Sequence, residues 1–156
     1  MSDTQSITLT LTQESDYSFR VSFDGDPIPD LLTDESPPLG RDAGPDPRRL
    51  LASAVGSCLA SSLLFAMRKF KNAPGTIVAR MTVHPTRNER GRLRIGSMAA
   101  EIQLPENAGD YQQIERILAQ FEDFCVVTES VRAGIPVEVS VVDAEGAMLH
   151  GDIPSA

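Results

Sequence analysis

The 156-residue chain is poor in the side chains from which disulfide scaffolds and metal sites are built. It has two cysteines, two histidines and no tryptophan. Two cysteines far apart do not make the disulfide framework of a small secreted domain. Even with His84 and His150 they do not form a recognisable zinc site. No metal or other cofactor is therefore expected, and Cys58 and Cys125 are either two inert buried thiols or a redox pair.

Long apolar runs and an excess of basic charge are missing as well. No uninterrupted apolar run approaches the roughly 18 residues of a membrane span. The N-terminal residues MSDTQSITLT lack the basic and apolar regions of a targeting peptide, so a cytoplasmic location is expected. The formal net charge is −8 and the basic residues are scattered. Electrostatics therefore argue against a nucleic-acid or anionic-membrane partner.

The most informative stretch that is present runs from Gly44 to Lys71. Pro45 and Pro47 suit a helix entrance, and Asp46 is a good N-cap residue. Apolar residues then recur at steps of three and four, which predicts an amphipathic central helix over residues 44–71. They are Leu50, Leu51, Ala54, Val55, Leu59, Leu63 and Phe70. Cys58 lies mid-helix among small residues, where another backbone could approach it closely.

Alternating apolar and polar residues predict strands on both sides of this helix. An N-terminal hairpin is expected to be half-buried, with Arg20 on the face opposite its aromatic residues. A short strand is expected inside the Pro-, Gly- and Asp-rich loop that follows, and a bulge at Gly96–Ser97 would restore one apolar face to the second strand after the helix. The predicted strands lie at residues 7–12, 17–23, 31–33, 76–84, 92–104 and 136–142.

Two shorter helices are predicted between the last two strands. Asp110 and Gln113 resemble a capping box, and an apolar face continues from there to a helix end near Phe124. Cys125 then opens a short helix that stops at Gly134. The N–H groups at a helix start favour a thiolate at Cys125.

The order of elements predicts the α+β class, with antiparallel sheets, a long central helix and a second helix. No βαβ periodicity and no internal repeat is present. The chain is expected to be a single domain, 1–156. Its predicted parts are N-terminal strands and loop (1–43), the central helix (44–71), and the later strands, second helix and closing strand (76–143).

Several segments together resemble the OsmC/Ohr family. They are DESPPLGRDAGPDP before the helix, LLASAVGSCL around Cys58, the second cysteine at the end of a later helix, and IPVEVSV in the closing strand. The resemblance implies an OsmC-like fold in which two subunits intertwine as a homodimer. It also implies a thiol-dependent peroxidase acting on small organic hydroperoxides. In that scheme Cys58 becomes a sulfenic acid, Cys125 condenses with it to a disulfide, and an external dithiol reduces the disulfide.

The resemblance leaves open how the Cys58 thiolate would be stabilised. Cys58 lies about 15 Å inside the predicted helix, too far for the N-terminal dipole to act, whereas a guanidinium could. In catalytic family members a Glu near the helix start holds an Arg from an early strand against the thiolate. This chain has Arg48 and Arg49 there, expected to pair with Asp42 or Asp46, and its candidate thiolate-activating residue is Arg20, with Arg41 as the other candidate.

A second departure from the family pattern lies at the later cysteine, which is usually followed by proline and here by Val126. Two hypotheses therefore stand. The chain is a homodimeric thiol peroxidase, or it is a non-catalytic OsmC-like dimer whose cleft binds an apolar ligand or partner.

Overall fold

The computed structural model describes residues 5–151. The chain divides into two compact units, Met1–Leu50 and Leu51–Ala156, which are described separately. The N-terminal unit is built around a three-stranded sheet, and the C-terminal unit around a four-stranded sheet covered by helices. This architecture confirms the predicted α+β class.

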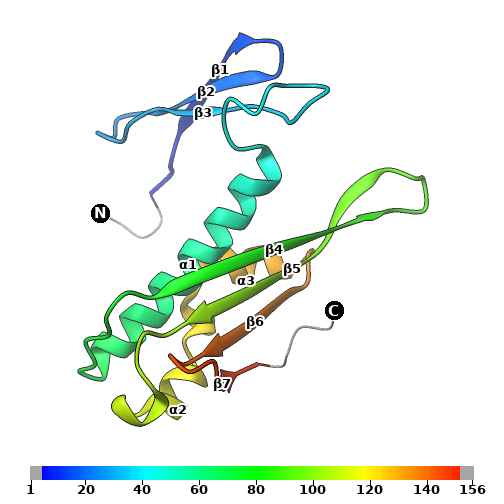
Figure 1. Ribbon diagram of the computed structural model, residues 1–156. Coiled ribbons are helices and arrows are strands. Elements are labelled where there is room, and N and C mark those ends of the chain that lie inside the picture. Colours follow the sequence, from blue (N-terminus) through cyan, green and yellow to red (C-terminus); the bar gives the residue numbers. More distant parts are fainter. Residues whose placement is uncertain (1–4, 152–156) are drawn as a thin grey trace. The chain divides into compact units, whose positions relative to one another are not determined.

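The N-terminal sheet is antiparallel, in the order β1 (Leu9–Ser15), β2 (Ser18–Phe23) and β3 (Leu31–Thr33) (Figure 1). The hairpin and the short third strand are confirmed. The expectation that the first strand is half-buried is wrong, because Leu9 and Leu11 are 45% and 55% exposed. Alternation places their side chains on one face, but no described residue of this small unit covers that face.

The loop between β3 and the long helix is ordered by one carboxylate. Asp34 is buried and accepts hydrogen bonds from the backbone N–H groups of Glu35, Arg41 and Ala43, at 2.9, 3.0 and 3.1 Å. Gly44 then passes so close to β3 that a Cβ there would lie 2.0 Å from the carbonyl oxygen of Leu32. The density of Asp, Pro and Gly in this segment thus reflects a tightly folded turn.

The predicted central helix is confirmed as α1 (Pro47–Lys69). Asp46 caps it as expected, since its Oδ1 accepts the N–H of Arg49 at 2.8 Å. One side of the helix is buried, and between the basic residues of its first and last turns the exposed side carries small residues and Phe65. By length and composition alone α1 could cross a membrane. Its side chains instead supply the core of the C-terminal unit, through Val55, Leu59, Leu63 and Met67.

The C-terminal sheet has the order β4 (Val78–Arg87), β5 (Leu93–Gln103), β6 (Val137–Val142) and β7 (Met148–His150). The predicted bulge is confirmed, because Gly96 is an extra residue between the pairs His84–Ser97 and Pro85–Ile95. The expectation of antiparallel sheets is wrong for one pair, since β5 and β6 run parallel. The helical segment between them crosses the sheet and returns the chain to the same end, as a parallel pair requires.

That crossover corrects the prediction of one helix from Asp110 to Phe124. The chain forms short pieces instead, namely η1 (Ala108–Asp110), α2 (Ile114–Leu118), η2 (Glu122–Phe124) and α3 (Val126–Arg132). The carboxylate of Asp110 reaches back to the N–H of Asn107 at 3.2 Å, so it closes η1 and does not start α2. The predicted apolar face is nevertheless buried, through Tyr111, Ile117, Leu118 and Phe121.

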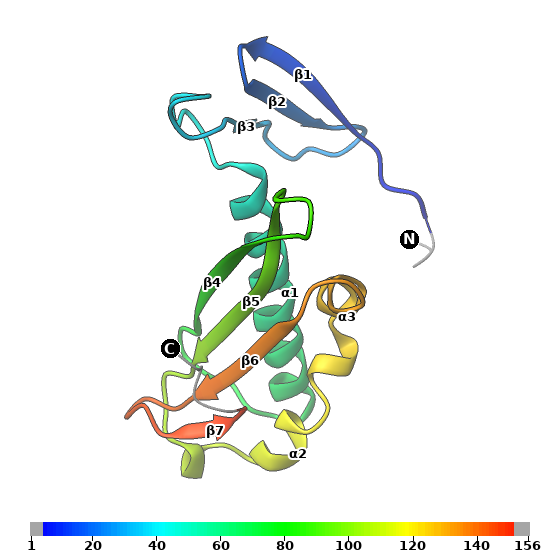
Figure 2. The ribbon, with the colours of Figure 1, turned by 90° about the vertical axis from the view of Figure 1, so that its right-hand side faces the viewer.

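Helices α1 and α3 lie on the same face of the four-stranded sheet in both views (Figures 1 and 2). The core fills the space between them and the strands. Its largest fully buried side chains include Phe121, Leu59, Met98 and Ile102. Cys125 belongs to this core, and Cys58 packs against it. The fold therefore brings both cysteines to the interface between the helical layer and the sheet.

Candidate functional site

The two cysteines, far apart in the sequence, meet in the C-terminal unit. Cys58 lies on α1 and is half-buried, while Cys125 is fully buried at the N-cap of α3. Both are free thiols, and they are near enough that the Cys58 side chain shifts the pKa of Cys125. The fold thus brings together the two residues that sequence reasoning selected, one partly exposed and the other buried.

The buried sulfur has a distinct environment. Burial raises the pKa of the Cys125 thiol above its usual value, and the neighbouring Cys58 side chain raises it further. The side chain and the backbone N–H of Thr128 favour the thiolate, as expected for a helix start, but burial outweighs them. Cys125 is therefore held as a thiol, and its Sγ–H donates to Thr128 Oγ1 at 2.9 Å.

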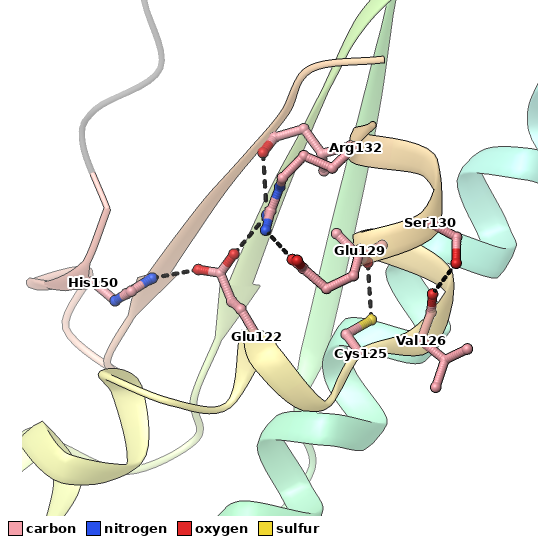
Figure 3. A network of polar contacts seen from close by, with 9 residues as sticks. Glu122, Cys125, Val126, Glu129, Ser130, Arg132 and His150 are labelled. Atoms are coloured by element: carbon pink, nitrogen blue, oxygen red, sulfur yellow. Dashed lines mark hydrogen bonds and ion pairs between the residues drawn. The ribbon is translucent and has the colours of Figure 1, made fainter. Parts of the chain in front are cut away.

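The segment that carries Cys125 is held by a charged network centred on Glu122 (Figure 3). One carboxylate oxygen of Glu122 lies 2.6 Å from Nη2 of Arg132, and the other lies 2.6 Å from Nε2 of His150. Arg132 also pairs with Glu129 at 2.5 Å. The network connects η2, α3 and β7, and so fixes the turn at which Cys125 stands.

Close to Cys58 in the sequence, α1 packs tightly against a side chain of β4. Gly56 is buried, and a Cβ at that position would lie 2.7 Å from Cγ of Met81. The atoms nearest to Gly56 belong to a side chain, so the expectation that another backbone approaches Cys58 stays a prediction.

At the helix start, Arg48 and Arg49 both pair with Asp46. The distances are 2.8 and 2.9 Å, which confirms one of the two expected partners. Burial alone would raise the pKa of the Asp46 carboxyl. The backbone N–H of Arg49 and the two guanidinium groups outweigh burial and hold that pKa below its usual range. Asp46 thus supplies a carboxylate at the helix start, and this carboxylate is already paired with Arg48 and Arg49.

The candidate thiolate-activating residues lie in the N-terminal unit. Arg20 forms an ion pair with Glu14, and this partner raises the pKa of the guanidinium. Arg41 donates to Ser15 Oγ at 3.0 Å. Both belong to a unit described separately from that of Cys58, so their action on its sulfur stays a prediction.

Sequence reasoning missed Thr128 and the Glu122–Arg132–His150 network. The position of Thr128, three residues after the N-cap Cys125, was the available signal, since a residue there can contact the capping side chain. No local pattern could have paired Glu122 with His150. Among residues 5–151, no group of three or more His, Cys, Asp or Glu side chains could hold a metal ion.

The profile of the family described as OsmC-like protein matches residues 40–140, which include Cys58, Cys125 and most of the C-terminal unit. The chain belongs to the OsmC-like family. The match crosses the boundary between the two units at Leu50.

Solved structures of OsmC-like proteins have the same fold at low identity. An OsmC-like protein of unknown function from Vibrio cholerae is 17% identical, with a TM-score of 0.70, over 86% of this chain and 99% of that chain. An organic hydroperoxide resistance protein from Elizabethkingia anophelis is 18% identical, with a TM-score of 0.69, over 92% and 99%. The organic hydroperoxide resistance protein OhrB of Bacillus subtilis is 15% identical, with a TM-score of 0.64, over 88% and 98%. No curated protein matches the chain.

Proposed function

We propose that this OsmC-like protein is a thiol-dependent peroxidase that reduces small organic hydroperoxides. The observation that carries the proposal is that Cys58 and Cys125 are neighbours in one core, near enough for Cys58 to shift the pKa of Cys125. Two neighbouring thiols can form a disulfide, which the resolving step of such an enzyme needs. Several structural relatives bear the name organic hydroperoxide resistance protein, which supports the same substrate class.

The roles of the two sulfurs follow from their burial. Cys58 is the more exposed, so its thiolate attacks a peroxide oxygen, the O–O bond breaks and the alcohol leaves. The oxygen stays on Cys58 as a sulfenic acid. Cys125, buried beside it, then displaces that oxygen as water and forms the disulfide. An external dithiol supplies the two electrons that restore both thiols, and no cofactor takes part.

Arg20 is the proposed thiolate-activating residue, with Arg41 as the alternative. A guanidinium beside Cys58 would favour its thiolate form. In this chain Arg20 would be oriented by Glu14, its ion-pair partner, because Asp46 is already bound to Arg48 and Arg49.

The proposal includes a homodimer in which each subunit is a single OsmC-like domain. Phe65 of α1 and, in the other unit, Leu9 and Leu11 of β1 are exposed, and a dimer interface would cover such large apolar side chains. Solved structures that cover 86% and 92% of this chain support counting both units as one domain. A cytoplasmic location fits two thiols that must be returned to the reduced state.

A second candidate function is a non-catalytic dimer that binds an apolar ligand or partner. The observation that favours it is the helix start, where Arg48 and Arg49 stand in place of the family's Glu. Without that Glu, Cys58 would lack an ordered activating guanidinium. The two candidates differ in whether peroxide produces a disulfide.

The deciding experiment exposes the reduced protein to cumene hydroperoxide or hydrogen peroxide and follows the products by mass spectrometry. The peroxidase predicts rapid, stoichiometric formation of the Cys58–Cys125 disulfide, faster with the organic peroxide. Cys58→Ser should abolish peroxide consumption, and Cys125→Ser should leave a trappable sulfenic acid on Cys58. Equal turnover by the Cys58→Ser protein would overturn the proposal, and the absence of any disulfide would favour the non-catalytic dimer.

A further inference from the structure

The side chain of Thr128 carries a buried hydroxyl group that is hydrogen-bonded to Cys125. Its side chain is 0% exposed, at the third position of α3, and its Oγ1 accepts the thiol proton of Cys125 at 2.9 Å. The neighbouring residues of this helix include Val126, Val127 and Val131. Packing alone would be served by another valine, which has the same shape as threonine and no polar atom to desolvate. The hydroxyl therefore calls for an explanation beyond packing.

We propose that Thr128 is a positioning residue for Cys125, which holds its sulfur toward Cys58 and stabilises its thiolate during disulfide formation. This inference rests on the proposed peroxidase function. In the resting state the Cys125 thiol donates to Thr128 Oγ1, which fixes the side-chain rotamer. When the thiol loses its proton, the hydroxyl turns and donates to the thiolate instead, as a hydroxyl can do in either direction.

The step balances without Thr128 gaining or losing a proton. The sulfenic acid of Cys58 and the thiol of Cys125 combine to one disulfide and one water. The S–O bond of Cys58 breaks as the S–S bond forms, and the proton from Cys125 leaves on the departing oxygen. Thr128 keeps its own proton throughout and acts only through its hydrogen bond to the attacking sulfur.

The other groups near Cys125 show why this hydrogen bond matters for the ionisation of its thiol. Burial and the contact with Cys58 both disfavour the Cys125 thiolate, whereas Thr128 favours it. The polar side chains drawn around the segment, namely Glu122, Glu129, Arg132 and His150, are paired among themselves (Figure 3). None of them is among the groups that shift the pKa of Cys125. Thr128 is thus the group that makes the buried sulfur easier to ionise.

The test compares Thr128→Val, which removes the hydroxyl and keeps the shape, with Thr128→Ser, which keeps the hydroxyl. Ser130→Ala is the matched control, because Ser130 lies on the same helix and its exposed hydroxyl donates to Val126 O at 2.7 Å. Stopped-flow mixing with cumene hydroperoxide separates oxidation of Cys58 from disulfide formation. Ultraviolet thiolate absorbance in a Cys58→Ser background, where Cys125 is the remaining thiol, gives its titration curve without peroxide.

Thr128→Val should leave Cys58 oxidation unchanged and slow disulfide formation about tenfold, the effect of one hydrogen bond to a charged group. It should also move the Cys125 titration upward by about one pH unit. Thr128→Ser and Ser130→Ala should behave like the parent protein. An unchanged titration curve in Thr128→Val, or a serine variant as slow as the valine variant, would overturn the inference. If no variant reacts with peroxide, the proposed peroxidase function fails, and the titration curve still decides the role of Thr128.

Discussion

Nε2 of His150 lies 2.6 Å from a carboxylate oxygen of Glu122, although the two residues are 28 positions apart. The imidazole also meets the ring of Phe121 edge-on, with 5.5 Å between the ring centroids. The last strand is thereby tied to the turn that presents Cys125.

The Glu122–His150 contact should stabilise this turn measurably but modestly. A double-mutant cycle with Glu122→Gln and His150→Gln is expected to give a coupling of about 0.5–1 kcal/mol, because both groups are partly exposed and screened by solvent. Chemical denaturation provides the free energies, and hydrogen exchange should show faster opening of residues 119–134 in each single variant. Strictly additive effects of the two substitutions would show that the contact contributes nothing.

The side chain of Asn72 should matter more, since it is buried and joins two distant segments. Its Nδ2 donates to Met67 O at 3.3 Å and to Gln112 O at 2.9 Å, and its Oδ1 accepts the N–H of Gln112 at 2.7 Å. Asn72→Ala is expected to lower the free energy of unfolding by about 1–3 kcal/mol, because it removes the hydrogen-bond partner of these backbone groups. Urea titration measures the loss. Gln120→Ala is the control, because the amide of Gln120 makes an exposed hydrogen bond, to Arg116 O in the same unit. An equally small effect at both positions would contradict the prediction.

Gly44 is expected to tolerate no side chain. A Cβ there would lie 2.0 Å from a backbone oxygen, which cannot move aside as a side chain could. Gly44→Ala should therefore destabilise the N-terminal unit by about 1–3 kcal/mol, the usual range for forced overpacking. Gly134→Ala is the matched control, because nothing lies within 4 Å of its added Cβ. Chemical denaturation with hydrogen exchange over residues 31–46 compares them, and equal stability of the two variants would refute the close approach.

Acid should weaken the loop that Asp34 organises. Hydrogen bonds from the backbone N–H groups of Arg41 and Ala43 hold the pKa of the Asp34 carboxyl below its usual 3.8. A lowered folded-state pKa adds stability that is fully present above the usual value and is lost as the pH falls through the folded value. Stability should therefore decline below about pH 4, and Asp34→Asn should make that decline shallower. Asp26→Asn, at an exposed carboxylate of the same unit, is the control, and identical profiles for the parent protein and both variants would contradict the assignment.

Much of the fold could be predicted because its signals are local. Asp46 and Pro47 start α1 through groups within one helical turn, and the bulge at Gly96 follows from a change of phase in a single strand. Cys125 was correctly placed at a helix start for the same reason. Each of these features depends on a few neighbouring residues, so the sequence around it suffices.

Other features depended on what each segment packs against. The stretch from Asp110 to Phe124 has a helical apolar pattern, yet it breaks into short turns that bury Tyr111 and Phe121 in the core. The parallel pairing of β5 and β6 depends on where the crossover returns the chain. Alternation in β1 predicted a buried face, but burial needs a covering element that no spacing along the strand can specify.

In the candidate site, too, some features follow from neighbouring residues and others from the packing of distant segments. By itself the sequence determined that a thiol stands mid-helix at Cys58 and another at the helix start at Cys125, through family motifs and capping chemistry. Only the tertiary structure decided that the two cysteines are neighbours, that Cys125 is the buried one, and that it donates a hydrogen bond to Thr128. The physical reason is that contacts between distant segments are set by how the helices and sheet pack around a common core, and that packing is a property of the whole chain.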